Sequence, residues 1–94
     1  MSEKDYKKKI CDIILKRKGA ETSIKVIELL LKRPFNNNQI AKRIDVDYNT
    51  ARYHLDLLVK NDLLMKDGDK YCALYYPTSG LKKNIETFNK LKNE

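Results

Sequence analysis

The sequence predicts a small, mainly helical α+β domain, and three features of the chain predict it. Residues 37–59 contain two short amphipathic segments joined by a turn of about three residues. An Asp-Gly pair at residues 67–68 lies between two short apolar segments, and further amphipathic segments lie at both ends of the chain. This order is typical of a winged helix-turn-helix, a three-helix core followed by a β-hairpin wing, here with extra N- and C-terminal helices.

The first two helices are expected from apolar spacing and from the residues that end them. A helix is expected from about residue 4 to residue 17, with Gly19 as its C-terminal cap. A second helix is expected to begin at Thr22 or Ser23 and to end before Pro34. Its inward side chains are expected to be Ile24, Ile27, Leu30 and Leu31.

The helix-turn-helix follows from two apolar stripes separated by a very short turn. The stripe of the first helix is Ile40, Ala41 and Ile44, and that of the second is Ala51, Leu55 and Leu58. Two helices joined so closely must cross steeply, and the small side chain of Ala41 lets them touch. Asn36 to Asn38 and Asp47 offer side-chain oxygens that can cap the two helices. The second helix, about residues 48–60, is the one that normally enters the DNA major groove.

The wing is expected from the segment of residues 63–76. Asp67-Gly68 favours a type I′ turn between two strands, since both central residues of that turn need a positive φ. After the hairpin, Thr78 or Ser79 can cap a last helix over about residues 80–92. A hairpin directly after a helix-turn-helix is a more specific signal than either part alone.

The same motifs resemble the winged-helix core of ArsR-type and related archaeal transcription regulators, over about residues 22–78. The segments that carry the resemblance are Ile40-Ala41, Thr50-Ala-Arg-Tyr-His-Leu55, Leu58 and Asn61-Asp-Leu-Leu64. The resemblance implies a DNA-binding transcription regulator. Asp45 and Asp62 stand where the family has glycines, which the fold tolerates because Asp enters the left-handed region more readily than most residues.

Length and composition agree with a single domain over residues 1–94. The chain is 41% apolar and 35% charged, and no apolar run approaches the roughly 20 residues of a membrane span. The N-terminus lacks the apolar core of a signal peptide, so we expect a cytoplasmic, nucleoid-associated protein with no membrane contact. The net charge of +7 favours an anionic partner, and double-stranded DNA is the partner that we expect.

The basic charge is unevenly distributed along the chain. Residues 1–34 contain ten Lys or Arg and five acidic residues. Residues 35–62, which include the predicted recognition helix, contain four of each. A lysine-rich solvated surface is the alternative explanation, because charge alone specifies solubility and weak association.

The outward side of the recognition helix carries the side chains that we expect to contact DNA. They are Tyr48, Asn49, Thr50, Arg52, Tyr53 and Asp56. Arg52 can donate a bidentate pair to guanine, and Asn49 can pair bidentately with adenine. Asp56 would repel the phosphate backbone unless it accepts from cytosine or orients Arg52. Tyr53 can stack on sugar or pack on its neighbours, and both alternatives stay open.

Four basic residues outside the recognition helix are further candidates for DNA contacts. Lys42 and Arg43 lie on the first helix of the motif and are expected to contact phosphates. Lys66 and Lys70 flank the tip of the wing, whereas Asp67 and Asp69 make the tip itself acidic. Deep insertion of the tip into the minor groove is therefore not expected.

The terminal helices carry apolar stripes that exceed what a winged-helix core needs. The stripe residues are Tyr6, Ile10, Ile13, Ile14, Leu81, Ile85, Phe88 and Leu91. We expect them to pair with each other and with a second chain in a two-fold homodimer, because an apolar stripe must be buried somewhere. The alternative is that both helices fold back on their own core. A homodimer would place two recognition helices about 34 Å apart, one turn of DNA.

Catalysis, a metal site, a cofactor and a small-molecule ligand are not expected. The one histidine, His54, has no acid or second histidine at a ligand-like spacing, and the chain has no phosphate-binding glycine loop. Cys11 and Cys72 lie far apart, so metal sensing through clustered cysteines is not carried over from the resemblance. The predicted function is sequence-specific transcription regulation. The alternatives are an architectural, weakly specific DNA-binding protein of chromatin type and a winged helix used for protein–protein contact.

Overall fold

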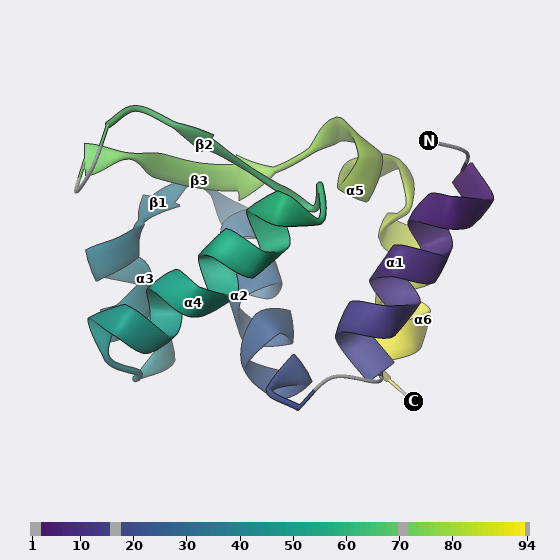
Figure 1. Ribbon diagram of the computed structural model, residues 1–94, viewed down its shortest axis with the longest axis horizontal. Coiled ribbons are helices and arrows are strands. Elements are labelled where there is room, and N and C mark those ends of the chain that lie inside the picture. Colours follow the sequence, from purple (N-terminus) through teal and green to yellow (C-terminus); the bar gives the residue numbers. More distant parts are fainter. Residues whose placement is uncertain (1–2, 16–17, 70–71, 94) are drawn as a thin grey trace.

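The computed structural model describes residues 3–15, 18–69 and 72–93, where six helices accompany a small sheet that lies along one side of the molecule (Figure 1). The helices are α1 (Glu3–Leu15), α2 (Ala20–Lys32), α3 (Asn37–Ile44), α4 (Tyr48–Lys60), α5 (Ser79–Lys83) and α6 (Ile85–Lys92). The strands are β1 (Phe35–Asn36), β2 (Leu64–Asp67) and β3 (Leu74–Pro77). The predicted fold class, a mainly helical winged helix-turn-helix with extra terminal helices, is confirmed. None of the described helices is long and apolar enough to cross a membrane.

Local hydrogen bonds set the ends of α3 and α4, as the sequence predicts. The Gln39 N–H donates to Asn36 Oδ1 over 2.8 Å, and the Asn36 N–H donates to Gln39 Oε1 over 3.0 Å, which together form a capping box. Asp45 ends α3 in the left-handed conformation, with φ of 59°. Asp47 Oδ1 then accepts from the Thr50 N–H over 2.6 Å and caps α4. These hydrogen bonds lower the pKa of Asp47.

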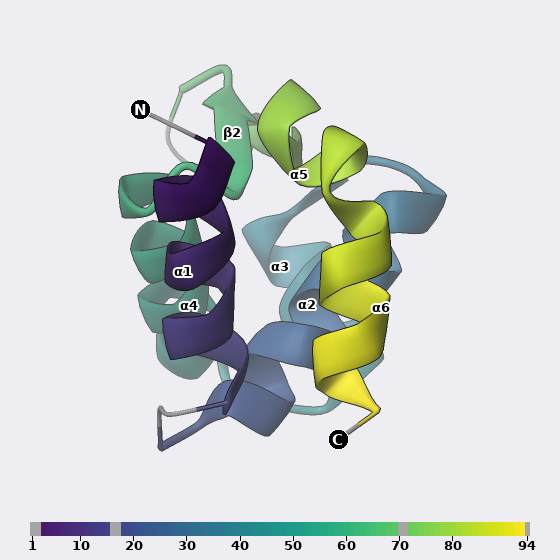
Figure 2. The ribbon, with the colours of Figure 1, turned by 90° about the vertical axis from the view of Figure 1, so that its right-hand side faces the viewer.

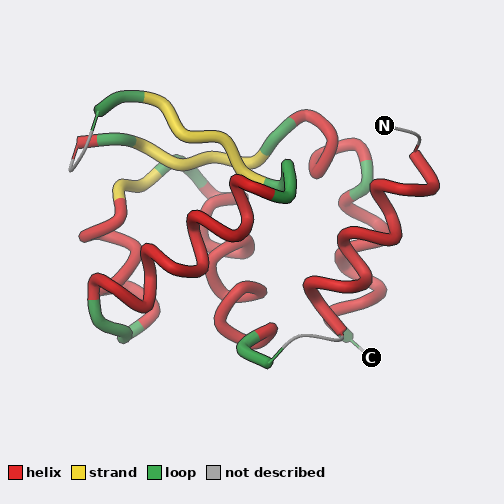
Figure 3. The backbone as a smooth tube through the Cα atoms, viewed as in Figure 1, coloured by secondary structure: helices red, strands yellow, loops and turns green. Residues whose placement is uncertain are grey.

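The three strands form an antiparallel sheet in the order β1-β3-β2, and β2 and β3 are the wing (Figure 3). The predicted hairpin is confirmed, but the predicted tight turn is wrong. Asp67 lies in β2 and pairs with Leu74, so the connection runs from Gly68 to Ala73. Gly68 has φ of 103°, and a Cβ there would lie 3.3 Å from the Ala73 Cα. The glycine therefore allows the two ends of a longer loop to approach closely.

Helix α2 differs from the sequence prediction in two ways. The helix begins at Ala20 rather than at residue 22 or 23, and Gly19 precedes it in the left-handed conformation with φ of 87°. Leu31, expected to face inward, is exposed, whereas Val26 is fully buried. Ile27 and Leu30 are buried as predicted, and Ser23 and Val26 complete the buried face of α2.

At the C-terminus, one predicted helix over about residues 80–92 is two helices in the structure, divided at Asn84. The Asn84 side chain donates to the Gly80 carbonyl over 2.9 Å, and the Asn84 N–H donates to the Leu81 carbonyl over 3.0 Å. Asparagine competes with the helical ladder in this way, which is why the stripe of apolar residues continues while the helix breaks. Thr78 Oγ1 accepts from the Leu81 N–H and caps α5.

Helices α1 and α6 lie side by side at one end of the molecule, although they come from opposite ends of the chain (Figure 2). Six of the eight residues expected at a dimer interface are buried within this one chain: Tyr6, Ile10, Ile13, Ile14, Leu81 and Phe88. The other two, Ile85 and Leu91, are half-buried and pack on the same core. The terminal stripes therefore fold back on their own core, and they no longer require a second chain to cover them.

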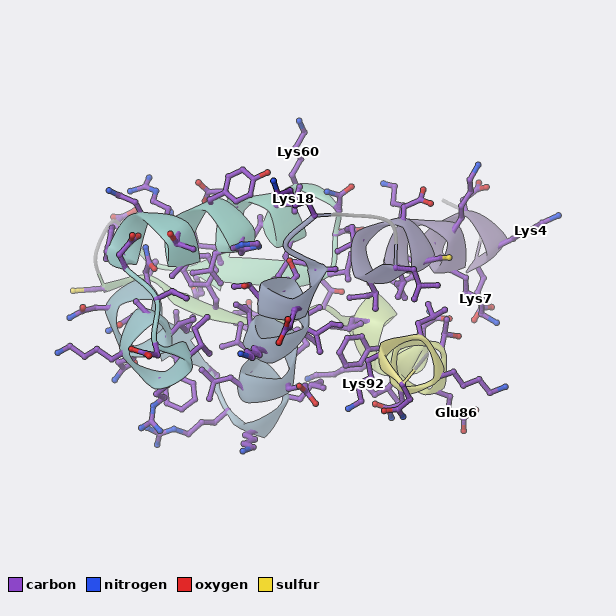
Figure 4. The ribbon with its side chains drawn as sticks, turned by 90° about the horizontal axis from the view of Figure 1, so that it is seen from below. Lys4, Lys7, Lys18, Lys60, Glu86 and Lys92 are labelled. Atoms are coloured by element: carbon purple, nitrogen blue, oxygen red, sulfur yellow. The ribbon has the colours of Figure 1, made fainter. Side chains whose placement is uncertain are left out.

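Polar contacts connect the terminal helices to the rest of the domain. The Tyr6 hydroxyl donates to the Asp62 carbonyl over 2.9 Å and lies 3.2 Å from Thr78 Oγ1, which itself donates to that carbonyl over 2.8 Å. Burial raises the pKa of the Tyr6 phenol, against the hydrogen bond with Thr78, and the charge of Asp62 raises it further. At the other end, Lys92 of α6 donates to Glu28 of α2 over 3.0 Å (Figure 4).

Candidate nucleic-acid interface

Helix α4 runs along one side of the molecule and is held there by its inner face. Ala51, Leu55 and Leu58 are fully buried, as the apolar stripe predicts, and His54 is buried beside them. Figure 4 shows α4 at one edge of the molecule, with Lys60 projecting outward from its end. A rigid helix with one side anchored in the core presents its opposite side for contact with a partner.

The six predicted contact residues of α4 differ in how far they reach solvent. Asn49, Arg52, Tyr53 and Asp56 are exposed, whereas Tyr48 and Thr50 are half-buried. The four exposed residues follow the spacing of one helical face. The structure thus brings them together on the outward side of α4.

Asp56 lies beside Arg52 on this surface. The distance from Arg52 Nε to Asp56 Oδ2 is 3.7 Å, and the two side chains are separated by one helical turn. Both are more than half exposed, so the pair contributes little to the stability of the fold. Both charged groups stay accessible on the outward face of α4. An orienting role of Asp56 toward Arg52 requires such a contact, and its other expected role, accepting from cytosine, stays a prediction.

Tyr75 of β3 was not among the predicted site residues, but it is buried in the same core as the inner face of α4. Its side chain is 4% exposed. Burial raises the pKa of the Tyr75 phenol, the charge of Asp56 raises it further, and the charge of Arg52 acts in the opposite direction. The wing strand β2 contacts α4, and Tyr75 of the paired strand β3 is buried in the core that also contains the inner face of α4. The alternation of Ala73, Tyr75 and Pro77 as inward residues was the available sequence signal.

His54 connects α4 to the beginning of α2. The hydroxyl oxygen of Ser23 and Nδ1 of His54 are 3.0 Å apart and both residues are buried. A Cβ on Gly19 would lie 3.1 Å from Cε1 of the same ring. Tyr53 meets the ring edge to face, with centroids 5.2 Å apart. His54 therefore packs at the edge of the core, and Tyr53 combines neighbour packing with a side chain that is 58% exposed.

The basic candidates outside α4 lie in different places. Lys42 is exposed on α3. Lys66 on β2 is exposed and stands opposite Tyr75, so it lies on the side of the wing that faces α4. Arg43 instead stacks over the ring of Phe35, with 4.5 Å from Cζ to the ring centroid. Lys70 lies outside the described residues.

No cluster that could hold a metal ion is present among the described residues, where no three His, Cys, Asp or Glu side chains converge. The exposed surface of α4 instead carries hydrogen-bond donors and acceptors of the kinds that bind base edges. A helix-turn-helix whose second helix exposes such side chains, followed by a wing, defines the class of winged-helix proteins.

Comparison with solved structures supports this fold. YusO from Bacillus subtilis aligns with a TM-score of 0.70 and 14% identity, over 96% of this chain and 67% of its own. A MarR family protein from Bacillus stearothermophilus aligns with a TM-score of 0.66 and 13% identity, over 96% and 66%. HlyU from Vibrio cholerae N16961 aligns with a TM-score of 0.69 and 14% identity, over the full length of both chains.

These similarities concern the fold. The chain spans about two thirds of the length of the first two structures. No protein-family model matches the sequence, and no curated protein matches it.

Proposed function

We propose that the chain is a sequence-specific, DNA-binding transcription regulator whose α4 enters the major groove. The observation that carries the proposal is the outward face of α4, where Arg52 Nε lies 3.7 Å from Asp56 Oδ2 and Asn49 lies exposed one turn earlier. Arg and Asn are the side chains best suited to bind guanine and adenine edges bidentately. The similarity in fold to a MarR family protein and to HlyU is consistent with this class.

In this proposal, each contact residue has one role. Arg52 and Asn49 recognise bases, while Thr50 and Lys42 bind phosphates on either side of the groove. Tyr48 and Tyr53 pack against sugars at the edge of the contact, and Lys66 and Lys70 bind the backbone beside the wing. Asp56 keeps Arg52 in position and accepts from cytosine where the base pair offers an amino group.

We also propose that the regulator is a homodimer in the cytoplasm, bound to the nucleoid. Helices α1 and α6 lie at the end of the molecule away from the wing loop (Figure 1). A second chain docked there would leave α4 accessible, and Leu15 at the end of α1 is 41% exposed. The motifs at residues 50–55 and 61–64 support an ArsR-type, archaeal subclass. Sedimentation at micromolar concentration tests the dimer, and a monomer there would contradict it.

A second candidate is an architectural, weakly specific DNA-binding protein. The observation in its favour is the charge distribution, because α4 and its surroundings are balanced while the basic excess lies in residues 1–34. Such a protein would bind through phosphates and would recognise no particular sequence.

Binding selection from a random DNA library at near-physiological salt distinguishes the two candidates. A regulator should recover a defined, palindromic site, whereas an architectural protein should bind tightly and recover no consensus. A protein that recovers no DNA at low salt would contradict both and would favour a protein–protein role for the winged helix.

The base-contact role is tested with two single substitutions in the protein. The affinity of each variant is measured for the selected site and for a scrambled site at equal salt. Arg52→Ala should lower discrimination between the two by about 1–3 kcal/mol at one base pair. Lys42→Ala is the matched control, since loss of a phosphate contact should weaken binding to both duplexes alike. If Arg52→Ala weakens binding to both equally, Arg52 is a backbone contact only.

The dependence on salt tests the nucleic-acid partner itself. Binding should weaken as salt rises, with a log-log slope of about −0.9 for each phosphate neutralised. Fluorescence anisotropy of a labelled duplex over a range of salt concentrations measures the slope. An affinity that does not change with salt would show that phosphates are not the main contact.

A further inference from the structure

Two arginines stack on the ring of one buried phenylalanine. They lie on a part of the surface that the proposed groove contact does not use. Cζ of Arg33 is 4.6 Å from the centroid of the Phe35 ring, and Cζ of Arg43 is 4.5 Å from it. Phe35 is 3% exposed, while both arginines are exposed. The two guanidinium carbons are therefore no more than about 9 Å apart, the sum of both distances. Stacking on the ring fixes each planar group and leaves its N–H edge available to an anion.

A shallow groove of 340 Å³ continues this basic surface between α2 and α3. It is lined by the basic residues Lys25, Lys32 and Arg43, together with Glu28, Leu29, Ile44 and Asp45. Lys25 and Lys32 are seven residues apart, about 10.5 Å along one face of α2. Arg43 lines this groove and also stacks on Phe35, so the basic residues of α2 and the Arg33–Phe35–Arg43 stack are connected through Arg43.

The charges of this surface are only partly neutralised. Glu28 is paired with Lys92 at 3.0 Å, and Lys25 is 3.9 Å from Glu21. Within the part of the chain that the structure describes, neither Arg33 nor Arg43 has an ion-pair partner. Neither guanidinium is neutralised by a carboxylate of the described residues, so both keep their charge and N–H donors for an anionic partner.

The surface lies away from the outward face of α4. In Figure 1, α4 is in front of α2 and α3, and in Figure 4, seen from below, α4 runs along one edge while α3 and the last turns of α2 lie toward the opposite edge. A phosphate bound by Arg33 and Arg43 therefore belongs to a different stretch of nucleic acid from the bases that face Arg52.

We infer that Arg33, Arg43, Lys32 and Lys25 form a second nucleic-acid surface, which binds the phosphate backbone of a duplex outside the stretch contacted by α4. A nucleic-acid backbone fits better than an acidic peptide because it presents evenly spaced phosphates along a line, and guanidinium binds each of them bidentately. The inference rests on the proposed function only in taking nucleic acid as the partner, and it does not depend on sequence specificity.

The salt dependence of binding to a duplex several turns long is the test. In Arg33→Gln/Arg43→Gln, the log-log slope should become shallower by about two, since each phosphate contact contributes about 0.9. The matched control is Lys82→Gln/Lys83→Gln, which removes two positive charges from exposed lysines of α5 and should leave the slope nearly unchanged. On a duplex of about one and a half helical turns, with room for α4 alone, the arginine variant should behave as the wild type.

Single substitutions keep the test valid if the double variant unfolds. Arg33→Gln and Arg43→Gln should each lower the slope by about one, and circular dichroism shows whether each remains folded. A folded arginine variant with an unchanged slope on the long duplex would overturn the inference. An equal decrease in the lysine control would also overturn it, because the effect would then be one of net charge.

A capture assay separates the two possible sources of the second backbone. Bead-bound duplex is mixed with protein and a second, labelled duplex. If the wild type captures the labelled duplex and the arginine variant captures at least tenfold less of it, the surface binds a separate duplex. If neither captures label but the slope on the long duplex still changes, the surface binds the flank of the same duplex. If the wild type does not bind the short duplex at all, that result would count against the proposed function and not against this inference.

Discussion

The α3–α4 pair and the α1–α6 pair are both made of short helices, but different interactions hold them. Three residues separate α3 from α4, and a side-chain cap stands before each helix. In contrast, α1 and α6 come from opposite ends of the chain, and α6 begins without a side-chain cap. Their contact depends on fully buried side chains such as Ile10 and Phe88. Local hydrogen bonds therefore shape the proposed interface, and burial between distant segments shapes the outer pair.

The largest expected effect breaks the outer pair at its centre. Phe88 is fully buried, so Phe88→Ala should lower the free energy of unfolding by about 3–5 kcal/mol, through lost burial and the cavity left behind. Urea unfolding followed by circular dichroism measures it. Met65→Ala is the control, because Met65 is 47% exposed and its loss should cost less than about 0.5 kcal/mol. Equal effects of the two substitutions would contradict the burial of α6 against α1.

A smaller effect is expected where a cap is removed from the helix-turn-helix. Asn36→Ala removes the oxygen that accepts from the Gln39 N–H, and it should lower the free energy of unfolding by about 1 kcal/mol. Asn38→Ala serves as the control, since Asn38 is exposed and makes no cap. Thermal unfolding of both variants gives the comparison. A cost for Asn36→Ala as large as that for Phe88→Ala would show that the two helix pairs do not differ as described.

The smallest effect concerns the hydroxyl that connects α1 to the turn after α4. Tyr6→Phe removes the hydrogen bond to the Asp62 carbonyl and should cost about 0.5–1.5 kcal/mol at neutral pH, because Thr78 still donates to that carbonyl. Denaturant unfolding at pH 7 measures this difference.

The same substitution tests the high-pH behaviour. The folded pKa of Tyr6 lies above its ordinary value of 10.0, so the neutral phenol is favoured in the fold. Its contribution to stability is fully present below pH 10.0 and is lost as the pH rises through the higher folded pKa. Tyr75 should act in the same direction. The wild type should therefore lose more stability above pH 10.0 than Tyr6→Phe does. Parallel losses in both proteins would show that Tyr6 does not titrate with unfolding.

The sequence predicts best where neighbouring residues determine the structure. The bounds of α3 and α4, the left-handed Asp45 and the cap at Asp47 all follow from residues within one helical turn. The break at Asn84 was missed because Leu81, Ile85 and Phe88 keep helical spacing across it. Strand β1 was missed because two residues give no pattern, and only the pairing of Phe35 with Tyr75 creates the strand.

The candidate site was predictable in its outline but not in its contacts. Helical spacing places Asn49, Arg52 and Asp56 on one face of α4, and the structure agrees. The burial of Tyr75 in the core that also contains Ala51 and Leu55 depends on contacts between distant segments, which no local pattern predicts. Arg43 was expected to contact phosphates, and that expectation stays a prediction. Its stacking on Phe35 was not foreseen, because no local pattern connects the two residues.

Glycine at position 19 satisfies two separate requirements. Its φ of 87° disfavours any residue with a side chain, and a Cβ would lie 3.1 Å from the ring of His54 in the recognition helix. The two positions should therefore covary among relatives of this chain. Where residue 54 keeps a ring, residue 19 should remain glycine, and where residue 19 is asparagine, a smaller side chain should stand at residue 54. An alignment of homologues would then mark true relatives by this pair of positions, even where the bases that they contact have changed.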